Sequence, residues 1–116
     1  MKKIRVLVVD DAYSMRELIV QELSEFGCEV EVVGEAKNGK EAIELFKELK
    51  PNLITMDINM PQLNGIDAIK EILKINPSIN IIVITGQYDS KKESLNAGAV
   101  DFLKKPFQPA FLWKKI

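Results

Sequence analysis

The sequence predicts an α/β fold in which helices cover both faces of a five-stranded parallel sheet. Short runs of β-branched residues alternate strictly with segments of helical period along the whole chain. The central runs are apolar at nearly every position, as expected of strands that helices cover on both faces. Because a helical segment separates each pair of strands, the connections are expected to be right-handed crossovers between parallel strands.

The first strand and helix are followed by a second, more polar strand. Ile4–Val9 is a near-continuous apolar run and is predicted to be a buried strand. Ser14 is the expected N-cap of a helix that ends at Gly27. Val30–Val33 alternates with glutamates, which indicates a more exposed strand at the edge of the sheet.

The middle of the chain supplies two helices around a short buried strand. Apolar residues at helical spacing predict a helix that follows Gly39 and ends before Pro51. Leu53–Met56 is the strand, and Gly65 opens the next helix, which ends at Asn76-Pro77.

The last third begins with the most apolar strand, Ile79–Thr85. A weak helix around Asp89–Ala97 and a strand near Asp101–Lys104 follow. The terminal stretch Pro109–Ile116 is shorter than a full helix, so we expect the last helix to be short or truncated.

Composition restricts the kinds of function that the chain can perform. Its 116 residues suit one domain over 1–116, and a net charge of −1 provides no basic surface for direct binding to nucleic acid or to anionic lipid. With no histidine, the chain cannot form Ser-His or Cys-His catalytic pairs or a histidine metal site. A single cysteine, with no apolar run of membrane-spanning length or signal-peptide pattern, favours a cytoplasmic protein with no membrane contact.

Polar residues stand where the predicted strands end. The first strand ends in Asp10 and Asp11, the third in Asp57, the fourth in Thr85, and the fifth in Lys105. Binding sites of open parallel sheets form at the carboxyl ends of the strands, near the point where strand order reverses. We therefore expect three carboxylates, a hydroxyl and an ammonium group to converge there.

Three converging carboxylates favour a bound cation. Two like charges about 4 Å apart repel by roughly 4 kcal/mol at an effective dielectric constant near 20. Oxygen ligands alone favour Mg²⁺, or alternatively Mn²⁺. Together with Lys105 and Thr85, the cation would suit a phosphoryl group, whose oxygens carry the charge during transfer. Asp57 is the best candidate nucleophile because Asp10 and Asp11 form the metal-holding pair.

Each of these residues also has a purely structural interpretation. Asp10 and Asp11 could cap the following helix, Thr85 could be an ordinary strand residue, and Lys105 could be a solvated loop charge. Their joint position at the ends of parallel strands favours the functional interpretation.

The chain resembles the response-regulator receiver domains over nearly its whole length. The resemblance rests on Val-Leu-Val-Val-Asp-Asp-Ala at 6–12, Ser-Met-Arg at 14–16, Gly-Glu-Ala-Lys-Asn-Gly-Lys-Glu-Ala at 34–42, Pro-Asn-Leu-Ile-Thr-Met-Asp-Ile-Asn-Met-Pro at 51–61, Asn-Gly-Ile-Asp-Ala-Ile-Lys-Glu-Ile at 64–72, Ile-Thr-Gly at 84–86, and Ala-Gly-Ala-Val-Asp-Phe-Leu-Lys-Lys-Pro-Phe-Gln-Pro at 97–109. The sequence of these motifs is most similar to that of the CheY-type single-domain receivers of chemotaxis. This family has the flavodoxin-like strand order 2-1-3-4-5.

The resemblance implies a phosphoacceptor and a metal site. Asp57 would accept the phosphoryl group from a histidine kinase. Asp11, Asp57 and the backbone carbonyl of Asn59 would bind Mg²⁺ directly, and Asp10 would act through water. The family is a set of signalling proteins rather than enzymes, apart from their own phosphotransfer and slow dephosphorylation.

The resemblance also implies a switch. Thr85 and Lys105 would contact the phosphoryl oxygens, and Phe102 would turn inward once Thr85 moves toward them. Phe102 also has a structural interpretation as an ordinary core aromatic. Asn59 and Gln87 occupy the positions at which the family tunes dephosphorylation.

The expected output partner is a downstream target protein such as a flagellar switch component. Two departures bear on the surface that would bind it: the segment between Thr85 and Phe102 is shorter than is usual in the family, and little chain follows Pro109. We therefore expect that this sequence is part of a longer chain, or that another subunit covers the apolar surface which the last helix would otherwise cover. Both a monomer and a dimer through the last-helix region are compatible with the sequence.

Three other functions fit parts of the pattern. A receiver could belong to a larger regulator with a DNA-binding or enzymatic output domain. A haloacid-dehalogenase-type phosphatase also uses an aspartate nucleophile, Mg²⁺ and a lysine, but needs Asp-x-Asp where this chain has adjacent acids, and a cap domain. A flavodoxin-like cofactor binder needs a phosphate-binding loop after the first strand, where Asp10 and Asp11 would repel phosphate.

Overall fold

The structure is a computed structural model that describes residues 4–25, 29–60, 62–86 and 91–105. It contains one parallel sheet in the order β2-β1-β3-β4-β5, which confirms the predicted fold class. The strands are β1 (Ile4–Val9), β2 (Val30–Ala36), β3 (Leu53–Met56), β4 (Asn80–Thr85) and β5 (Asp101–Lys104). The helices are α1 (Tyr13–Glu25), α2 (Gly39–Leu49), α3 (Gly65–Ile75) and α4 (Lys91–Ala97).

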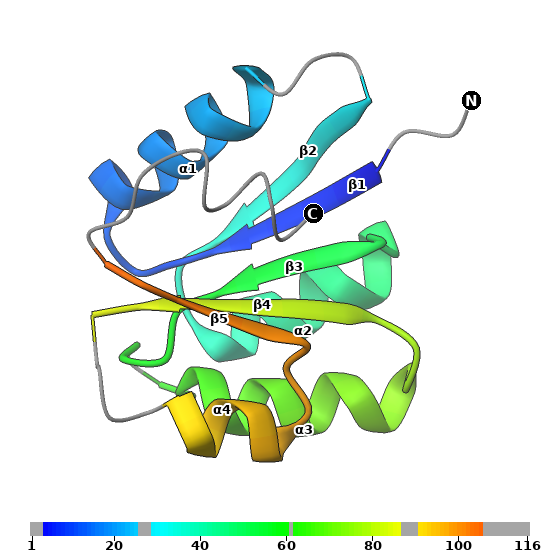
Figure 1. Ribbon diagram of the computed structural model, residues 1–116. Helices are drawn as coiled ribbons and strands as arrows, with labels where there is room; N and C mark the ends of the chain where they lie inside the picture. Colours follow the sequence, from blue (N-terminus) through cyan, green and yellow to red (C-terminus); the bar gives the residue numbers. More distant parts are fainter. Residues whose placement is uncertain (1–3, 26–28, 61, 87–90, 106–116) are drawn as a thin grey trace.

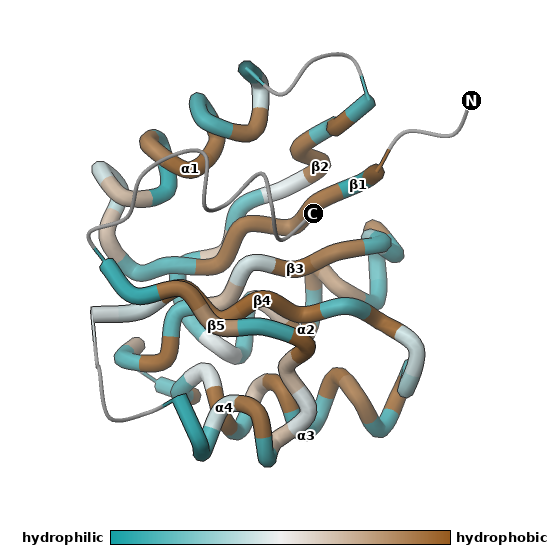
Figure 2. The backbone as a smooth tube through the Cα atoms, viewed as in Figure 1, coloured by the Kyte–Doolittle hydropathy of each residue, from teal (hydrophilic) through white to brown (hydrophobic). Residues whose placement is uncertain are grey.

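Helices lie on both faces of the sheet, as Figure 1 shows. Helix α1 covers one face, where Ile19 and Leu23 pack with Val6 and Val8 of β1. Helices α2 and α3 cover the other face through a larger apolar cluster. The central strands are mostly brown in Figure 2, whereas the helices alternate between brown and teal. This difference follows from burial of the central strands on both faces and of each helix on one.

Several predicted element bounds are confirmed and three are corrected. Strands β1, β3 and β5 and the start of α3 match the expectation. Helix α1 begins at Tyr13, so Ser14 is not its N-cap. The reason is that the carbonyl of Ala12 already accepts hydrogen bonds from Met15 and Arg16. The predicted stop at Gly27 lies outside the described residues.

The second strand is longer than its apolar run. A register shift between Val6 and Leu7 of β1 lets pairing continue through Gly34 to Ala36, beyond the predicted end at Val33. Its predicted place at the edge of the sheet is confirmed. Pairing between strands, rather than side-chain alternation, therefore determines where β2 ends.

The remaining correction concerns the start of β4. Strand β4 begins at Asn80 because Ile79 donates its backbone N–H to Asn76 in the preceding turn. Helix α4 spans Lys91–Ala97 in the described chain, and Asp89, where the helix was expected to start, lies outside the described residues, so that start stays a prediction. The stretch Pro109–Ile116 and the expected short last helix also lie outside the described residues. Across the described residues, no helix combines the length and the hydropathy that crossing a membrane requires.

Asparagine residues are the N-caps of the two helices that follow β2 and β3. The Asn38 side chain accepts a hydrogen bond from the N–H of Glu41 at 2.8 Å, and the Asn64 side chain accepts one from Asp67 at 3.0 Å. These N-caps satisfy backbone donors that have no partner within a helix. They also hold the two loops that lead from the carboxyl ends of β2 and β3 into α2 and α3.

Candidate functional site

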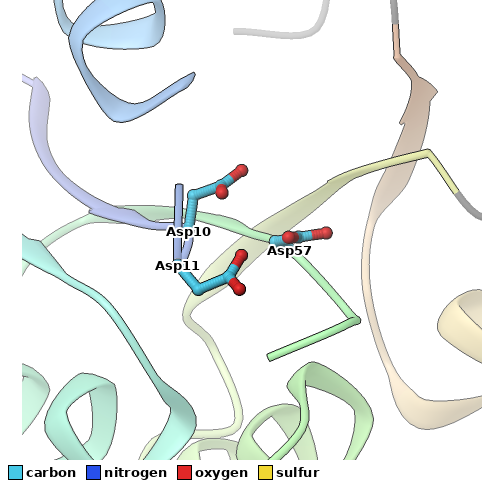
Figure 3. Close-up of side chains that lie close together, drawn as sticks. All are labelled: Asp10, Asp11 and Asp57. Carbon is cyan, nitrogen blue, oxygen red and sulfur yellow. The ribbon is translucent and has the colours of Figure 1, made fainter. Parts of the chain in front are cut away.

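The polar residues expected at the strand ends lie together at one edge of the sheet. Asp10 and Asp11 follow β1, Asp57 follows β3, Thr85 ends β4, and Lys105 follows β5. Because all five strands are parallel, these ends share one edge, on the left of Figure 1. Carboxylate oxygens of the three aspartates lie within 4.8 Å of one another, and Figure 3 shows the three side chains close together.

Backbone contacts hold two of these aspartates in place. The N–H of Asp10 donates to Ala36 of β2 at 3.0 Å, and the N–H of Asp57 donates to Val9 of β1 at 3.0 Å. Each carboxylate also accepts a local backbone hydrogen bond, Asp10 Oδ1 from Ala12 at 2.9 Å and Asp57 Oδ1 from Ile58 at 2.8 Å. Asp10 and Asp57 are 1% and 5% exposed, whereas Asp11 is exposed. The site therefore has two buried, oriented carboxylates and one that faces solvent.

Lys105 connects the first and third strands through its ammonium group. Its Nζ lies 2.6 Å from Asp10 Oδ2 and 3.6 Å from Asp57 Oδ2. The backbone N–H of Lys105 donates to the carbonyl of Thr85 at 2.9 Å, which places the lysine beside the end of β4. The ammonium group thus contacts two of the three carboxylates in this cluster.

The electrostatic environment of Asp57 is unfavourable to its negative charge. Burial raises the pKa of this carboxyl above its usual value, and the negative charge of Asp10 raises it further. The ammonium group of Lys105, a hydrogen bond with the Thr85 side chain and the N–H of Ile58 act in the opposite direction and lower this pKa. Because the pKa remains raised, the cluster is short of positive charge.

The cluster fits a hard divalent cation. It offers three carboxylates whose oxygens lie within 4.8 Å of one another, and the raised Asp57 pKa shows that an added positive charge would stabilise the ionised form. Carboxylate oxygens suit Mg²⁺, which takes one or two carboxylates and keeps several waters. The chemistry of these donors agrees with the ion expected from the sequence.

The remaining residues singled out in the sequence are Phe102, Asn59 and Gln87. Phe102 is 9% exposed and belongs to the core cluster on the α2–α3 face, where β5 pairs it with Val83 of β4. Asn59 is exposed in the loop after Asp57, and Gln87 lies outside the described residues. The geometry of these residues does not test the roles that the resemblance implies, so those roles stay predictions.

Two residues contact the site although the sequence suggested no such contact. The guanidinium group of Arg16 donates to the carbonyl oxygen of Asp10 at 2.8 Å. Gly65 lies so close to Asp57 that a Cβ would overlap the Asp57 carbonyl oxygen. A glycine at the first position of a helix is a weak signal of such an approach, and a lone arginine in a first turn gives none.

Comparison with known proteins points to one family. The model of the response regulator receiver domain matches residues 6–116. The chemotaxis protein CheY of Thermotoga maritima is 55% identical over 108 residues, which cover 91% of this chain and 88% of that protein. A protein-glutamate methylesterase/protein-glutamine glutaminase of Methanococcus maripaludis is 47% identical over 109 residues, which cover 91% of this chain but only 30% of that protein.

Solved structures agree with this assignment. The response regulator domain of Thermotoga maritima CheB superposes with a TM-score of 0.88 at 38% identity, covering 98% of this chain and 93% of that one. A chain of the CheX-CheY-BeF3-Mg²⁺ complex from Borrelia burgdorferi superposes with a TM-score of 0.91 at 26% identity, covering 98% and 87%. From its family match, its relatives and its sheet order, this chain belongs to the response regulator receiver domain family, with CheY-type proteins among its relatives.

Proposed function

We propose that residues 1–116 form one receiver domain that accepts a phosphoryl group from a histidine kinase onto Asp57 in the presence of Mg²⁺. The observation that carries this proposal is the position of Lys105, whose ammonium group faces both Asp10 and Asp57 beside the open carboxylate of Asp11. This arrangement places a nucleophilic oxygen next to the positive charge of Lys105 and within a carboxylate cluster that could hold a divalent cation. Such a site suits phosphoryl transfer, which depends mainly on positioning and on electrostatic stabilisation.

The two oxygens of Asp57 have different surroundings. Oδ1 accepts the N–H of Ile58 at 2.8 Å, whereas Oδ2 lies 3.6 Å from the Lys105 ammonium group. In the proposed step, one oxygen of Asp57 forms a bond to phosphorus as the bond from phosphorus to the donor nitrogen breaks. The electron pair of that bond remains on the donor imidazole, and Lys105 offsets charge on the phosphoryl oxygens.

The metal would be held by the acidic cluster. Asp11, Asp57 and the backbone carbonyl of Asn59 would bind it directly, and Asp10 would act through water. When bound, Mg²⁺ supplies positive charge that offsets repulsion between the nucleophile and the phosphoryl oxygens. The raised pKa of Asp57 supports this assignment because the carboxylate alone lacks sufficient neutralisation.

Thr85 and Phe102 would form the switch that reports phosphorylation. The Thr85 side chain is hydrogen-bonded with Asp57 in this structure. A phosphoryl group adds close to two negative charges and competes for that hydroxyl group. Movement of Thr85 would bias two arrangements of neighbouring Phe102, and a 1:99 to 99:1 shift between them requires about 5.5 kcal/mol of differential binding. Asn59 and Gln87 would tune the rate at which the phosphoryl group is lost.

The proposed setting is cytoplasmic signalling of the chemotaxis type. A CheY of 55% identity supports this setting, as does a structural neighbour from a complex with CheX, BeF3 and Mg²⁺. The output would be a phosphorylation-dependent protein partner, such as a flagellar switch component, with no direct contact to nucleic acid or membrane. The chain would act as a monomer, or as a dimer through the last-helix region.

A second candidate is the receiver part of a longer regulator. The observation that favours it is the methylesterase relative, of which the chain covers only 30%. In that case phosphorylation would control an attached output domain rather than a separate target. A pull-down with beryllofluoride-loaded and unloaded protein distinguishes the two candidates, because only the first expects phosphorylation-dependent capture of a separate target.

Labelling with radioactive acetyl phosphate and Mg²⁺ tests the phosphoacceptor. We expect hydroxylamine-labile label on the wild type, as for an acyl phosphate, and none on Asp57→Asn. Glu44→Gln, which removes an exposed carboxylate of α2, is the matched control and should label normally. Label retained by Asp57→Asn would overturn the assignment, and repeated turnover of a phosphate ester would favour the phosphatase alternative.

A further inference from the structure

Arg16, in the first turn of α1, makes three contacts beside the acidic cluster. Its Nη1 donates to the backbone carbonyl of Asp10 at 2.8 Å, and its Nε lies 3.3 Å from Glu35 Oε1 on β2. The guanidinium carbon lies 5.6 Å from the centroid of the Tyr13 ring. The Arg16 side chain is 14% exposed, so the group is largely removed from water. These contacts connect the end of β1 with α1 and β2.

The carbonyl that Arg16 contacts belongs to the peptide between Asp10 and Asp11. The Asp10 carboxylate has its own contacts, with the N–H of Ala12 at 2.9 Å and with Lys105 at 2.6 Å. The Asp11 carboxylate is exposed and has no hydrogen bond or ion pair within the ranges that the structure describes. Its direction, beside Asp57 in Figure 3, therefore depends on the orientation of its backbone.

We propose that Arg16 is a positioning residue that fixes this peptide and thereby orients Asp11 toward the divalent cation. The inference rests on the proposed function, because it assumes that the acidic cluster binds Mg²⁺. Planar guanidinium groups suit this task, since two nitrogens can bind two acceptors in fixed directions. Here one nitrogen contacts the Asp10 carbonyl and another contacts Glu35, which holds the plane of the guanidinium group.

Charge alone would predict the opposite effect of Arg16 on metal binding. A cation close to a divalent ion repels it, so removal of Arg16 would strengthen Mg²⁺ binding if charge were its only influence. If Arg16 positions Asp11, its removal weakens Mg²⁺ binding instead, because the carboxylate is no longer held in direction. The sign of the change therefore separates the two roles.

The experiment measures the Mg²⁺ dissociation constant by isothermal titration calorimetry at pH 7.5, together with urea unfolding in EDTA. The variants are Arg16→Met, Arg16→Lys and Glu35→Gln. Arg5→Met is the matched control, because Arg5 Nη1 also donates to a backbone carbonyl, that of Lys50 at 2.9 Å, at the opposite end of β1. Both arginine-to-methionine variants lose an arginine-to-carbonyl hydrogen bond, whereas Arg16→Met also loses the contacts with Glu35 and Tyr13, so the unfolding in EDTA measures the stability of each variant separately.

We expect Arg16→Met to weaken Mg²⁺ binding by about tenfold or more, the range found when partners of metal ligands are removed. Arg16→Lys should recover part of the loss, Glu35→Gln should show a smaller loss, and Arg5→Met should bind as the wild type does. Unchanged or tighter binding by Arg16→Met would overturn the inference, as would an equal loss in Arg5→Met. Absence of Mg²⁺ binding by the wild type would instead count against the proposed function.

Discussion

Gly65, the first residue of α3, lies directly against the main chain of Asp57. A Cβ at position 65 would overlap the Asp57 carbonyl oxygen and come within 2.8 Å of the Ile58 Cα. The N–H of Gly65 also donates to the Ile58 carbonyl at 2.9 Å. Helix α3 thus begins beside the candidate phosphoacceptor and supports the backbone that carries it.

This contact predicts a cost for any side chain at position 65. We expect Gly65→Ala to lower the free energy of unfolding by about 1–3 kcal/mol, as overpacking usually does. Urea unfolding followed by circular dichroism measures the change. Gly86→Ala is the control, because a Cβ at position 86 would have no heavy atom within 4 Å. Equal stabilities of the two variants would show that the approach of Gly65 to Asp57 has no energetic consequence.

The raised pKa of Asp57 predicts a pH-dependent effect of its charge. Because burial and Asp10 raise this pKa in the folded state, the folded protein binds the Asp57 proton more tightly than the unfolded chain does. The stability that this proton contributes is complete below the ordinary carboxyl pKa of about 3.9. It is lost as the pH rises through the raised value.

Asp57→Asn removes this charge and should therefore be more stable than the wild type at pH 7.5 in EDTA. The difference should shrink as the pH falls toward about 3.9, the ordinary carboxyl pKa, where the wild-type residue becomes protonated in both states. Urea unfolding at several pH values measures it, with Glu44→Gln as the exposed control. A variant less stable than the wild type at pH 7.5 contradicts the interpretation.

Magnesium should stabilise the wild type by binding only the folded state. At a concentration one hundred times the dissociation constant, the expected gain is about 2.7 kcal/mol. Asp11→Asn should lose most of this gain while its stability in EDTA changes little, because Asp11 is exposed. Thermal unfolding with Mg²⁺ and with EDTA tests this. An equal Mg²⁺ effect in both proteins would remove Asp11 from the site.

Two buried threonines on neighbouring strands should respond differently to loss of the hydroxyl group. Thr55, 1% exposed on β3, has an Oγ1 with no hydrogen-bond partner among the residues that the structure describes. The Thr85 hydroxyl group, by contrast, bonds with Asp57. We expect Thr55→Val to keep or increase stability by up to about 1 kcal/mol, because a buried hydroxyl without a partner is costly.

Thr85→Val should give no such gain and should raise the pKa of Asp57 further, since the hydrogen bond with Thr85 lowers it. Urea unfolding compares the stabilities, and carboxyl chemical shifts of Asp57 during an NMR titration report its pKa. A large loss of stability in Thr55→Val would mean that its hydroxyl group has a partner.

The sequence was sufficient to predict the fold class because periodicity records which faces of each element are buried. The bounds predicted for the apolar strands Ile4–Val9 and Leu53–Met56 agree with those in the structure. The end of β2 at Ala36 was not predicted, because pairing with β1 extends it past its apolar residues. Likewise, the first turn of α1 depends on the Ala12 carbonyl rather than on Ser14, so propensity placed its start incorrectly.

The sequence alone also determined which strand ends carry the acids, the threonine and the lysine, because parallel strands place their carboxyl ends at one edge. Only the tertiary structure decided their contacts. Lys105 is far from Asp10 in sequence. Their 2.6 Å contact forms because the Lys105 side chain reaches from the end of β5 past the ends of β4 and β3, which lie between β5 and β1 in the sheet. The contact of Arg16 with the Asp10 carbonyl and the closeness of Gly65 to Asp57 depend in the same way on how helices pack against strand ends. Periodicity records burial but not such distances, because they arise only when separate elements come together.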